Sequence, residues 1–186
     1  MTRIIAGAAS AARLKVPAAG TRPTSDKVRE ALFSALEASF EFADARVLDL
    51  YAGSGALGLE AVSRGAESAV LVEQARSAAQ LLKQNCEAVQ ALVPGARIEV
   101  AAEPVRRFLG AAGAEFDLAF VDPPYNLDNA ALSGDLELLL PRLSPDALVI
   151  VERDMRSGAF ELPAGLQLWR ERKYGETVLF FIEPRA

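Results

Sequence analysis

With 186 residues, of which 51% are hydrophobic and 24% are charged, the chain has the size and composition of a single globular domain rather than a disordered segment. Its single cysteine excludes an intramolecular disulfide, and its lack of histidine excludes Ser-His and Cys-His catalysis and the commonest zinc ligand, so we expect no bound metal. The net charge is −5, but residues 1–30 alone carry +4 and the remainder −9, which indicates an acidic body with a basic arm for an anionic partner.

The N-terminal segment predicts a small β-hairpin followed by a helix. Residues 2–6 and 13–16 are β-prone and are separated by Gly7 and a run of small residues. After a loop that contains two prolines, apolar residues recur at helical spacing over residues 25–40. A hairpin that precedes the main α/β series would place basic side chains at one end of the molecule.

A strand, a glycine-rich turn and a helix come next, at residues 46–58. Branched apolar residues predict a buried parallel strand, and the glycines that follow let a ligand approach the backbone amides of the first helical turn. The spacing Gly53-x-Gly55-x-x-Gly58 matches the dinucleotide fingerprint, and Glu73 follows where a ribose-binding acid is expected. The spacing by itself therefore indicates an NAD site.

Asp49, near the end of that strand, favours a different cofactor. Its carboxylate would repel a pyrophosphate, whereas it would attract the cationic amino group of S-adenosylmethionine (SAM). The turn leaves both cofactors open, and the choice depends on residues elsewhere in the chain.

The remaining elements alternate between helix and strand. Strands are expected at residues 68–73, 97–101, 116–121 and 148–152, and helices at residues 57–64, 75–92, 104–112 and 128–143. Two β-prone runs on either side of Gly175, residues 166–173 and 177–183, predict a closing antiparallel hairpin. Because carboxyl ends of parallel strands meet at one edge of a sheet, the glycine turn, Glu73 and Asp122 should share one site.

The motif Asp122-Pro123-Pro124-Tyr125 follows an apolar strand and suits the chemistry of an exocyclic base amine. Two prolines stiffen the turn, while Asp122 and the Pro123 carbonyl offer two hydrogen-bond acceptors. Acceptors on both amine hydrogens would hold the nitrogen as it pyramidalises and direct its lone pair at a methyl donor. Tyr125 offers an aromatic face on which a flipped-out base could stack.

These features together resemble the class I SAM-dependent methyltransferases and, among them, the RsmD-type family. The resemblance is carried by residues 3–7, 22–33, 49–61, 122–125 and 174–177. That family methylates the N2 amine of one guanine in bacterial small-subunit (16S) ribosomal RNA. The resemblance implies a Rossmann-like α/β fold with a mostly parallel seven-stranded sheet that ends in an antiparallel hairpin, acting as a monomer on 16S RNA or the assembling small subunit.

The resemblance also implies roles for individual residues. The residues expected to bind SAM are Asp49, Ala52, Gly53, Ser54, Gly55, Gly58, Glu73 and, for the adenine, Glu103. The residues expected to hold the guanine are Asp122, Pro123, Pro124 and Tyr125. The residues expected to bind RNA phosphates are Arg3, Arg13, Lys15, Arg22, Lys27 and Arg29. Residues 1–24 would then be a β-hairpin extension for RNA recognition, and residues 25–186 the methyltransferase domain.

The chain departs from the family pattern in two places. The family usually has an Asp-Ala pair where this chain has Pro104-Val105, which is why the adenine contact is assigned to Glu103. The family's hairpin is also richer in arginine and glycine, whereas residues 8–12 here are four alanines and a serine. The basic residues outside that turn are therefore expected to carry more of the phosphate binding.

Other functions fit parts of the sequence. The Asp-Pro-Pro-Tyr motif (residues 122–125) also serves methylation of amines in DNA and of amides in proteins, and the glycine spacing fits an NAD-dependent oxidoreductase. A nucleic-acid-binding module without turnover is a further alternative. Because no run approaches the roughly 20 apolar residues that cross a bilayer, we expect a soluble, cytoplasmic protein.

Overall fold

The computed structural model of the protein describes residues 2–16 and 25–185. Within these ranges the strands are β1 (Thr2–Arg3), β2 (Arg13–Leu14), β3 (Arg46–Leu50), β4 (Ser68–Val72), β5 (Arg97–Ala101), β6 (Phe116–Val121), β7 (Leu143–Asp154), β8 (Leu166–Tyr174) and β9 (Thr177–Pro184). The α-helices are α1 (Asp26–Glu37), α2 (Ala56–Ser63), α3 (Arg76–Gln90), α4 (Val105–Gly110) and α5 (Asn129–Leu139).

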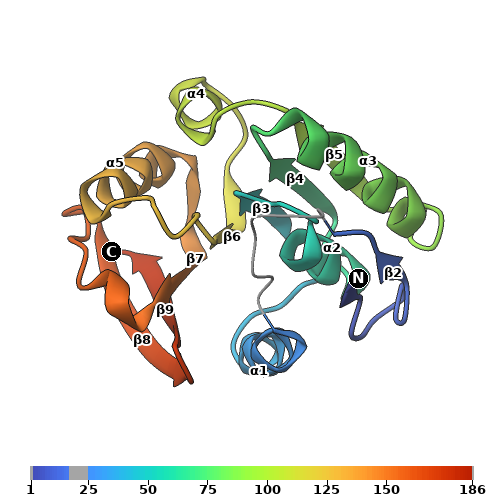
Figure 1. Ribbon diagram of the computed structural model, residues 1–186, viewed down its shortest axis with the longest axis horizontal. Coiled ribbons are helices and arrows are strands. Elements are labelled where there is room, and N and C mark those ends of the chain that lie inside the picture. Colours follow the sequence, from blue (N-terminus) through green and yellow to red (C-terminus); the bar gives the residue numbers. More distant parts are fainter. Residues whose placement is uncertain (1, 17–24, 186) are drawn as a thin grey trace.

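A seven-stranded sheet in the order β5-β4-β3-β6-β7-β9-β8 forms the centre of the part that the structure describes (Figure 1). The first five of these strands are parallel neighbours, and β9 inserts antiparallel between β7 and β8. β1 and β2 form a separate antiparallel pair. The predicted Rossmann-like fold, its closing hairpin and the N-terminal hairpin are all confirmed.

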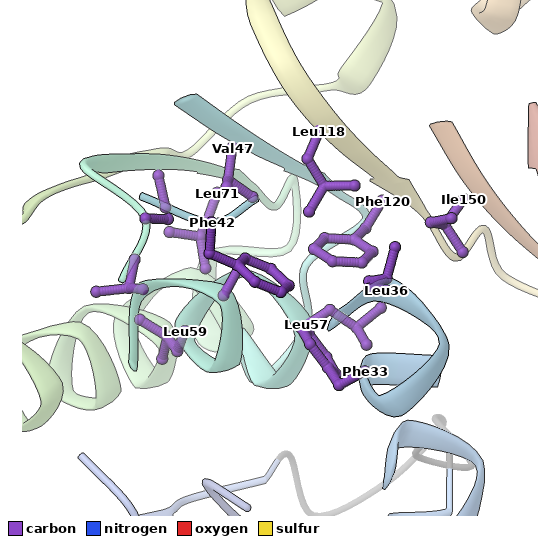
Figure 2. Packing of buried hydrophobic residues seen from close by; sticks show 14 of the residues in the cluster. Phe33, Leu36, Phe42, Val47, Leu57, Leu59, Leu71, Leu118, Phe120 and Ile150 are labelled. Carbon is purple, nitrogen blue, oxygen red and sulfur yellow. The ribbon is translucent and has the colours of Figure 1, made fainter. Parts of the chain in front are cut away.

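Helices cover both faces of the sheet. Buried residues of α1, α2 and α3 pack with one set of strand side chains, and those of α4 and α5 pack with the opposite set. Figure 2 shows the first layer, in which Phe33 and Leu36 of α1 lie close to Phe120 of β6. We call this side of the sheet the α1 face and the other the α5 face. No described helix is both long and apolar enough to cross a membrane.

The α5 region differs from the predicted helix at residues 128–143. The α-helix ends at Leu139, residues Leu140–Arg142 form a 3-10 turn, and Leu143 already belongs to β7. Pro141 explains the early end, because it lacks the N–H that a continuing α-helix needs. As a result β7 is 12 residues long and not the five expected.

The N-terminal hairpin is attached to α2. The backbone N–H groups of Ile5 and Ala6 donate to the carboxylate of Glu60 at 2.6 and 3.0 Å, and the N–H of Ala9 donates to Ser63 Oγ at 2.9 Å. Gly7 has φ +84°, and a Cβ there would lie 1.9 Å from the Ser63 carbonyl oxygen, so only glycine fits. Glu60 is fully buried, so its bonds to the hairpin are shielded from water.

Candidate active site

A cavity of about 540 Å³ lies at the carboxyl ends of β3, β4, β6 and β7, next to the turn between β8 and β9. Its lining includes Asp49, Glu73, Asp122, Tyr125 and Glu152. The sheet therefore brings the acid of the glycine turn and the Asp-Pro-Pro-Tyr motif to one site, as its strand order predicts. Among the described residues, no group of three or more His, Cys, Asp or Glu side chains could hold a metal ion.

Asp49 is a buried acid at the base of this cavity. It is 2% exposed, and its Oδ2 accepts a hydrogen bond from the Gly58 N–H at 2.8 Å. Burial raises the pKa of Asp49 to about 7, although the Gly58 amide opposes this shift and the nearby Glu73 carboxylate adds to it. A cation in the cavity would offset the cost of keeping this carboxylate ionised.

Glu73 follows β4 and holds the glycine turn. Its two carboxylate oxygens accept from the N–H of Gly53 at 3.1 Å and the N–H of Ala75 at 2.7 Å. Gly53 has φ +56°, which a glycine adopts without strain. The sequence therefore placed Glu73 correctly at the cavity, and the structure adds that it organises the protein's own backbone.

Gly55 and Gly58 are packing positions, and neither is part of the cavity lining. A Cβ on Gly55 would lie 2.5 Å from Leu82 Cδ1, and a Cβ on Gly58 would lie 3.0 Å from the Cβ of Asp49. They allow α2 to pack closely on β3 and β4. Ala52, Gly53 and Ser54 do line the cavity, so the predicted turn contributes through its first half.

Asn85 of α3 joins the glycine turn to the N-terminal hairpin. Its side-chain amide donates to the carbonyls of Ser54 at 2.8 Å and Lys15 at 2.9 Å, and its oxygen accepts from the Lys15 N–H at 2.9 Å. Asn85 is 2% exposed, so these bonds are made away from solvent. Nothing in the helical pattern of α3 distinguished it, because its role depends on two distant segments.

The Asp-Pro-Pro-Tyr motif leaves the sheet where β6 ends, at Val121. Pro123 is buried and Tyr125 is 63% exposed, so the motif turns from the core into the cavity mouth. Arg153 of β7 supports the loop, because its Nη2 donates to the Leu127 carbonyl at 3.0 Å and to Asn129 Oδ1 at 2.9 Å. Burial lowers the pKa of Arg153, and its Nε has no hydrogen-bond partner among the described residues.

Tyr51 and Glu152 line the cavity without having been predicted. Tyr51, with φ +61°, donates through its hydroxyl to Asp135 of α5, which also pairs with Arg106 at 2.9 Å. Glu152 lies near the carboxyl end of β7. The strand-end argument that identified Asp122 could have identified Glu152, whereas the Tyr51 bond depends on how α5 packs.

Glu103 does not belong to the cavity. It pairs with Arg107 at 3.2 Å, one turn along α4, while Val105 lines the cavity. The adenine contact at Glu103 therefore stays a prediction.

The basic residues expected to bind RNA fall into different environments. Arg3, Arg13, Lys15 and Lys27 are exposed, and Arg22 lies outside the described residues. Arg29 contradicts the expectation, because it is 1% exposed and its Nη2 donates to Thr2 Oγ1, the Arg3 carbonyl and Asp26 Oδ1, each at 2.8 Å. It joins α1 to β1 and also lines the cavity, so it is a buried structural residue and not an exposed phosphate contact.

Comparisons with known proteins agree with this geometry. The model of the family "Conserved hypothetical protein 95" matches residues 2–183. The chain is 38% identical over 187 aligned positions to ribosomal RNA small subunit methyltransferase D of Escherichia coli K12, covering 99% of this chain and 90% of that protein.

Solved structures agree as well. The chain superposes on the yhhF protein of Escherichia coli with a TM-score of 0.83 and 34% identity, covering 99% of this chain and 98% of that one. For a hypothetical protein of Thermus thermophilus the TM-score is 0.82 and the identity 39%, covering 98% and 99% of the two chains. The fold, the cavity and these relatives lead to one conclusion: the chain belongs to the Conserved hypothetical protein 95 family, that of the RsmD-type methyltransferases.

Proposed function

We propose that the protein transfers a methyl group from SAM to the exocyclic N2 amine of a specific guanine in the 16S RNA of the small ribosomal subunit. The observation that carries this proposal is the single cavity that Asp49, Glu73 and the Asp-Pro-Pro-Tyr motif share. The relative in Escherichia coli is named for a small-subunit RNA methyltransferase, which supports the same substrate class.

One side of the cavity suits SAM. We call Asp49, Gly53 and Glu73 the cofactor wall. Asp49 would bind the cationic amino group, the backbone from Ala52 to Ser54 would border the methionine part, and Glu73 would accept from the ribose hydroxyls. Because Asp49 is 2% exposed, a bound cation would be its natural charge partner there. SAM would supply an electrophilic methyl group on a sulfonium.

The opposite side suits a guanine. We call Asp122, Pro123 and Tyr125 the substrate wall. The Asp122 carboxylate and the Pro123 carbonyl would accept from the two hydrogens of the N2 amine, which directs its lone pair toward the cofactor wall. Tyr125, 63% exposed at the cavity mouth, would stack on the flipped base. Arg153 would keep this loop in place through the Leu127 carbonyl, 3.0 Å away.

The glycine spacing no longer supports an NAD enzyme. Gly55 and Gly58 face packed protein atoms, so the fingerprint reflects how α2 packs on the sheet and not an opening for a pyrophosphate. The exposed Arg3, Arg13, Lys15 and Lys27 would hold RNA phosphates, and the same role is proposed for Arg22, which lies outside the described residues.

The direct test is transfer of labelled methyl from SAM to 16S RNA, either naked or in a partly assembled subunit, from cells that lack this modification. Mass spectrometry should find label on guanine N2. Label on DNA adenine or on protein would contradict the proposal. Thermal-shift titration gives a second check, because SAM should stabilise the folded protein and NAD should not. RNA binding without methyl transfer would indicate a binding module.

A further inference from the structure

Strand β8 forms the edge of the sheet beyond β9 (Figure 1). Its last residue, Tyr174, lines the cavity. Trp169, Arg170 and Arg172 precede it, and Trp169 is 40% exposed although it is a large apolar side chain. An aromatic residue and two basic residues thus lie along a strand that leads to the proposed site.

The pairing of β8 with β9 shows that these side chains share the α1 face. Arg170 is opposite Phe181 and Arg172 is opposite Leu179, and both partners belong to the cluster packed under α1. The register shifts between Leu168 and Arg170, so Trp169 is an additional residue in the strand. The Trp169 ring meets the Phe181 ring edge-on at 6.1 Å, which places it on the same face.

The two faces of β8 differ in charge. Glu171 and Lys173 alternate with the arginines toward the α5 face and pair with each other at 3.1 Å. In residues 2–16 and 25–185, no carboxylate lies within ion-pair distance of the Arg170 or Arg172 guanidinium. The α1 face of β8 therefore carries two uncompensated positive charges, whereas the α5 face is neutral over the same stretch.

Trp169 and Arg170 also form a stacked pair. The guanidinium carbon of Arg170 lies 4.4 Å from the centre of the Trp169 ring. Aromatic rings and guanidinium planes are the surfaces on which unpaired RNA bases stack, and arginine also binds phosphate. Same-face residues of a strand are about 6.6 Å apart, so Trp169, Arg170, Arg172 and Tyr174 form one row along the edge strand that ends at the cavity.

We infer that the α1 face of β8 is a second RNA-binding surface, which holds the strand next to the target guanine. Trp169 and Arg170 would stack on a flanking base, Arg172 would bind a phosphate, and Tyr174 would border the entry of the guanine. This inference rests on the proposed function, because it assumes that the cavity receives a nucleotide of RNA. It adds a contact region remote from the N-terminal hairpin.

Arg172 and Lys173 provide a matched test, since they are neighbours on one strand and point to opposite faces. Affinity for 16S RNA lacking the modification is measured against salt concentration for R172A and K173A. R172A should bind about three- to tenfold more weakly, with a salt slope lower by about 1, and K173A should match wild type. R170A/R172A should lower the affinity further, while SAM affinity and the unfolding midpoint stay unchanged.

Trp169 is tested by W169L, which keeps an apolar cover over Phe181 but removes the stacking face. It should raise the KM for RNA severalfold with little change in kcat.

The outcomes separate the two proposals. If the wild-type protein methylates no RNA, the proposed function is wrong. The RNA affinities of R172A and K173A would still show whether the α1 face of β8 binds RNA. Equal RNA affinity of R172A and K173A would overturn this inference. Weakening by R172A on assembled particles but not on naked RNA would also overturn it, because that result assigns the surface to a protein of the particle.

Discussion

The two walls of the cavity differ in how their side chains are held. The carboxylates of the cofactor wall accept hydrogen bonds from nearby backbone amides, whereas the substrate wall ends in the exposed side chain of Tyr125. Asp49 is 2% exposed and binds the Gly58 amide, and Glu73 binds two amides of its own surroundings, while Tyr125 is 63% exposed. The first wall therefore contains a buried carboxylate held by backbone amides, and the second runs from the buried Pro123 to the exposed Tyr125. Changes in the cofactor wall should alter stability and SAM affinity, and changes in the substrate wall should alter methyl transfer and RNA binding but not SAM affinity.

Asp122→Ala, in the substrate wall, should have the largest effect of these substitutions, and it should act on methyl transfer without affecting the cofactor wall. Losing one acceptor on the reacting amine should lower kcat about 100- to 1000-fold, by analogy with the removal of a single preorganised hydrogen-bonding group. SAM affinity measured by calorimetry and the unfolding midpoint should not change. Asp146→Ala, at an exposed site near the start of β7, is the control and should keep full activity. Full methyl transfer by Asp122→Ala would exclude this residue from the chemistry.

Arg29→Ala should show that this arginine is structural. The variant loses three hydrogen bonds to β1 and α1 in a buried site, so the free energy of unfolding should fall by about 2–3 kcal/mol. The exposed Arg13→Ala should change stability by less than about 0.5 kcal/mol and weaken RNA binding instead. Denaturant unfolding and RNA titration of both variants check this, and a reversed pattern would restore Arg29 as an RNA contact.

Gly58→Ala should disturb the cofactor wall through packing. The new Cβ would lie 3.0 Å from the Asp49 Cβ and 3.1 Å from its Oδ2, so α2 must shift, at a cost of about 1–3 kcal/mol. SAM binding should weaken in parallel. Gly110→Ala, in α4 with no atom near the added Cβ, should instead be neutral or stabilise by up to about 1 kcal/mol. Equal unfolding free energies for the two variants would show that the close approach at Gly58 does not matter.

The pKa of Asp49 should make SAM binding depend on pH. Because this pKa is raised to about 7, the folded protein without cofactor retains a proton on Asp49 that the unfolded chain loses near pH 4. Stability from this group is therefore greatest at low pH and is lost as the pH rises to about 7. The ammonium group of SAM binds the ionised form of Asp49. As the pH is raised toward this pKa, SAM affinity should therefore increase by up to about tenfold for each pH unit, and it should level off above the pKa.

Calorimetry from pH 5.5 to 7.5 in buffers of different ionisation enthalpy checks both the affinity and the proton released. Asp49→Asn should bind SAM more weakly and lose this dependence. An unchanged pH profile in Asp49→Asn would show that another group titrates.

The sequence predicts the sheet and the position of the site well, because alternation of elements and strand ends follow from local patterns. Asp49, Glu73 and Asp122 each lie near the end of an apolar run, so topology alone brings them together. Arg29 was misplaced because its helical position looks polar until β1 folds over it.

The attachment of the N-terminal hairpin to α2 has a consequence for target selection. Glu60 and Ser63 hold the hairpin to the helix that begins at the glycine turn, and Asn85 joins Lys15 to that same turn. The hairpin is therefore connected to the cofactor wall by direct hydrogen bonds. If Arg13 and Lys15 bind an RNA phosphate, these hydrogen bonds fix the distance between that phosphate and the methyl donor. The protein would then methylate a guanine that lies at this distance from the bound phosphate and leave identical bases elsewhere unmodified.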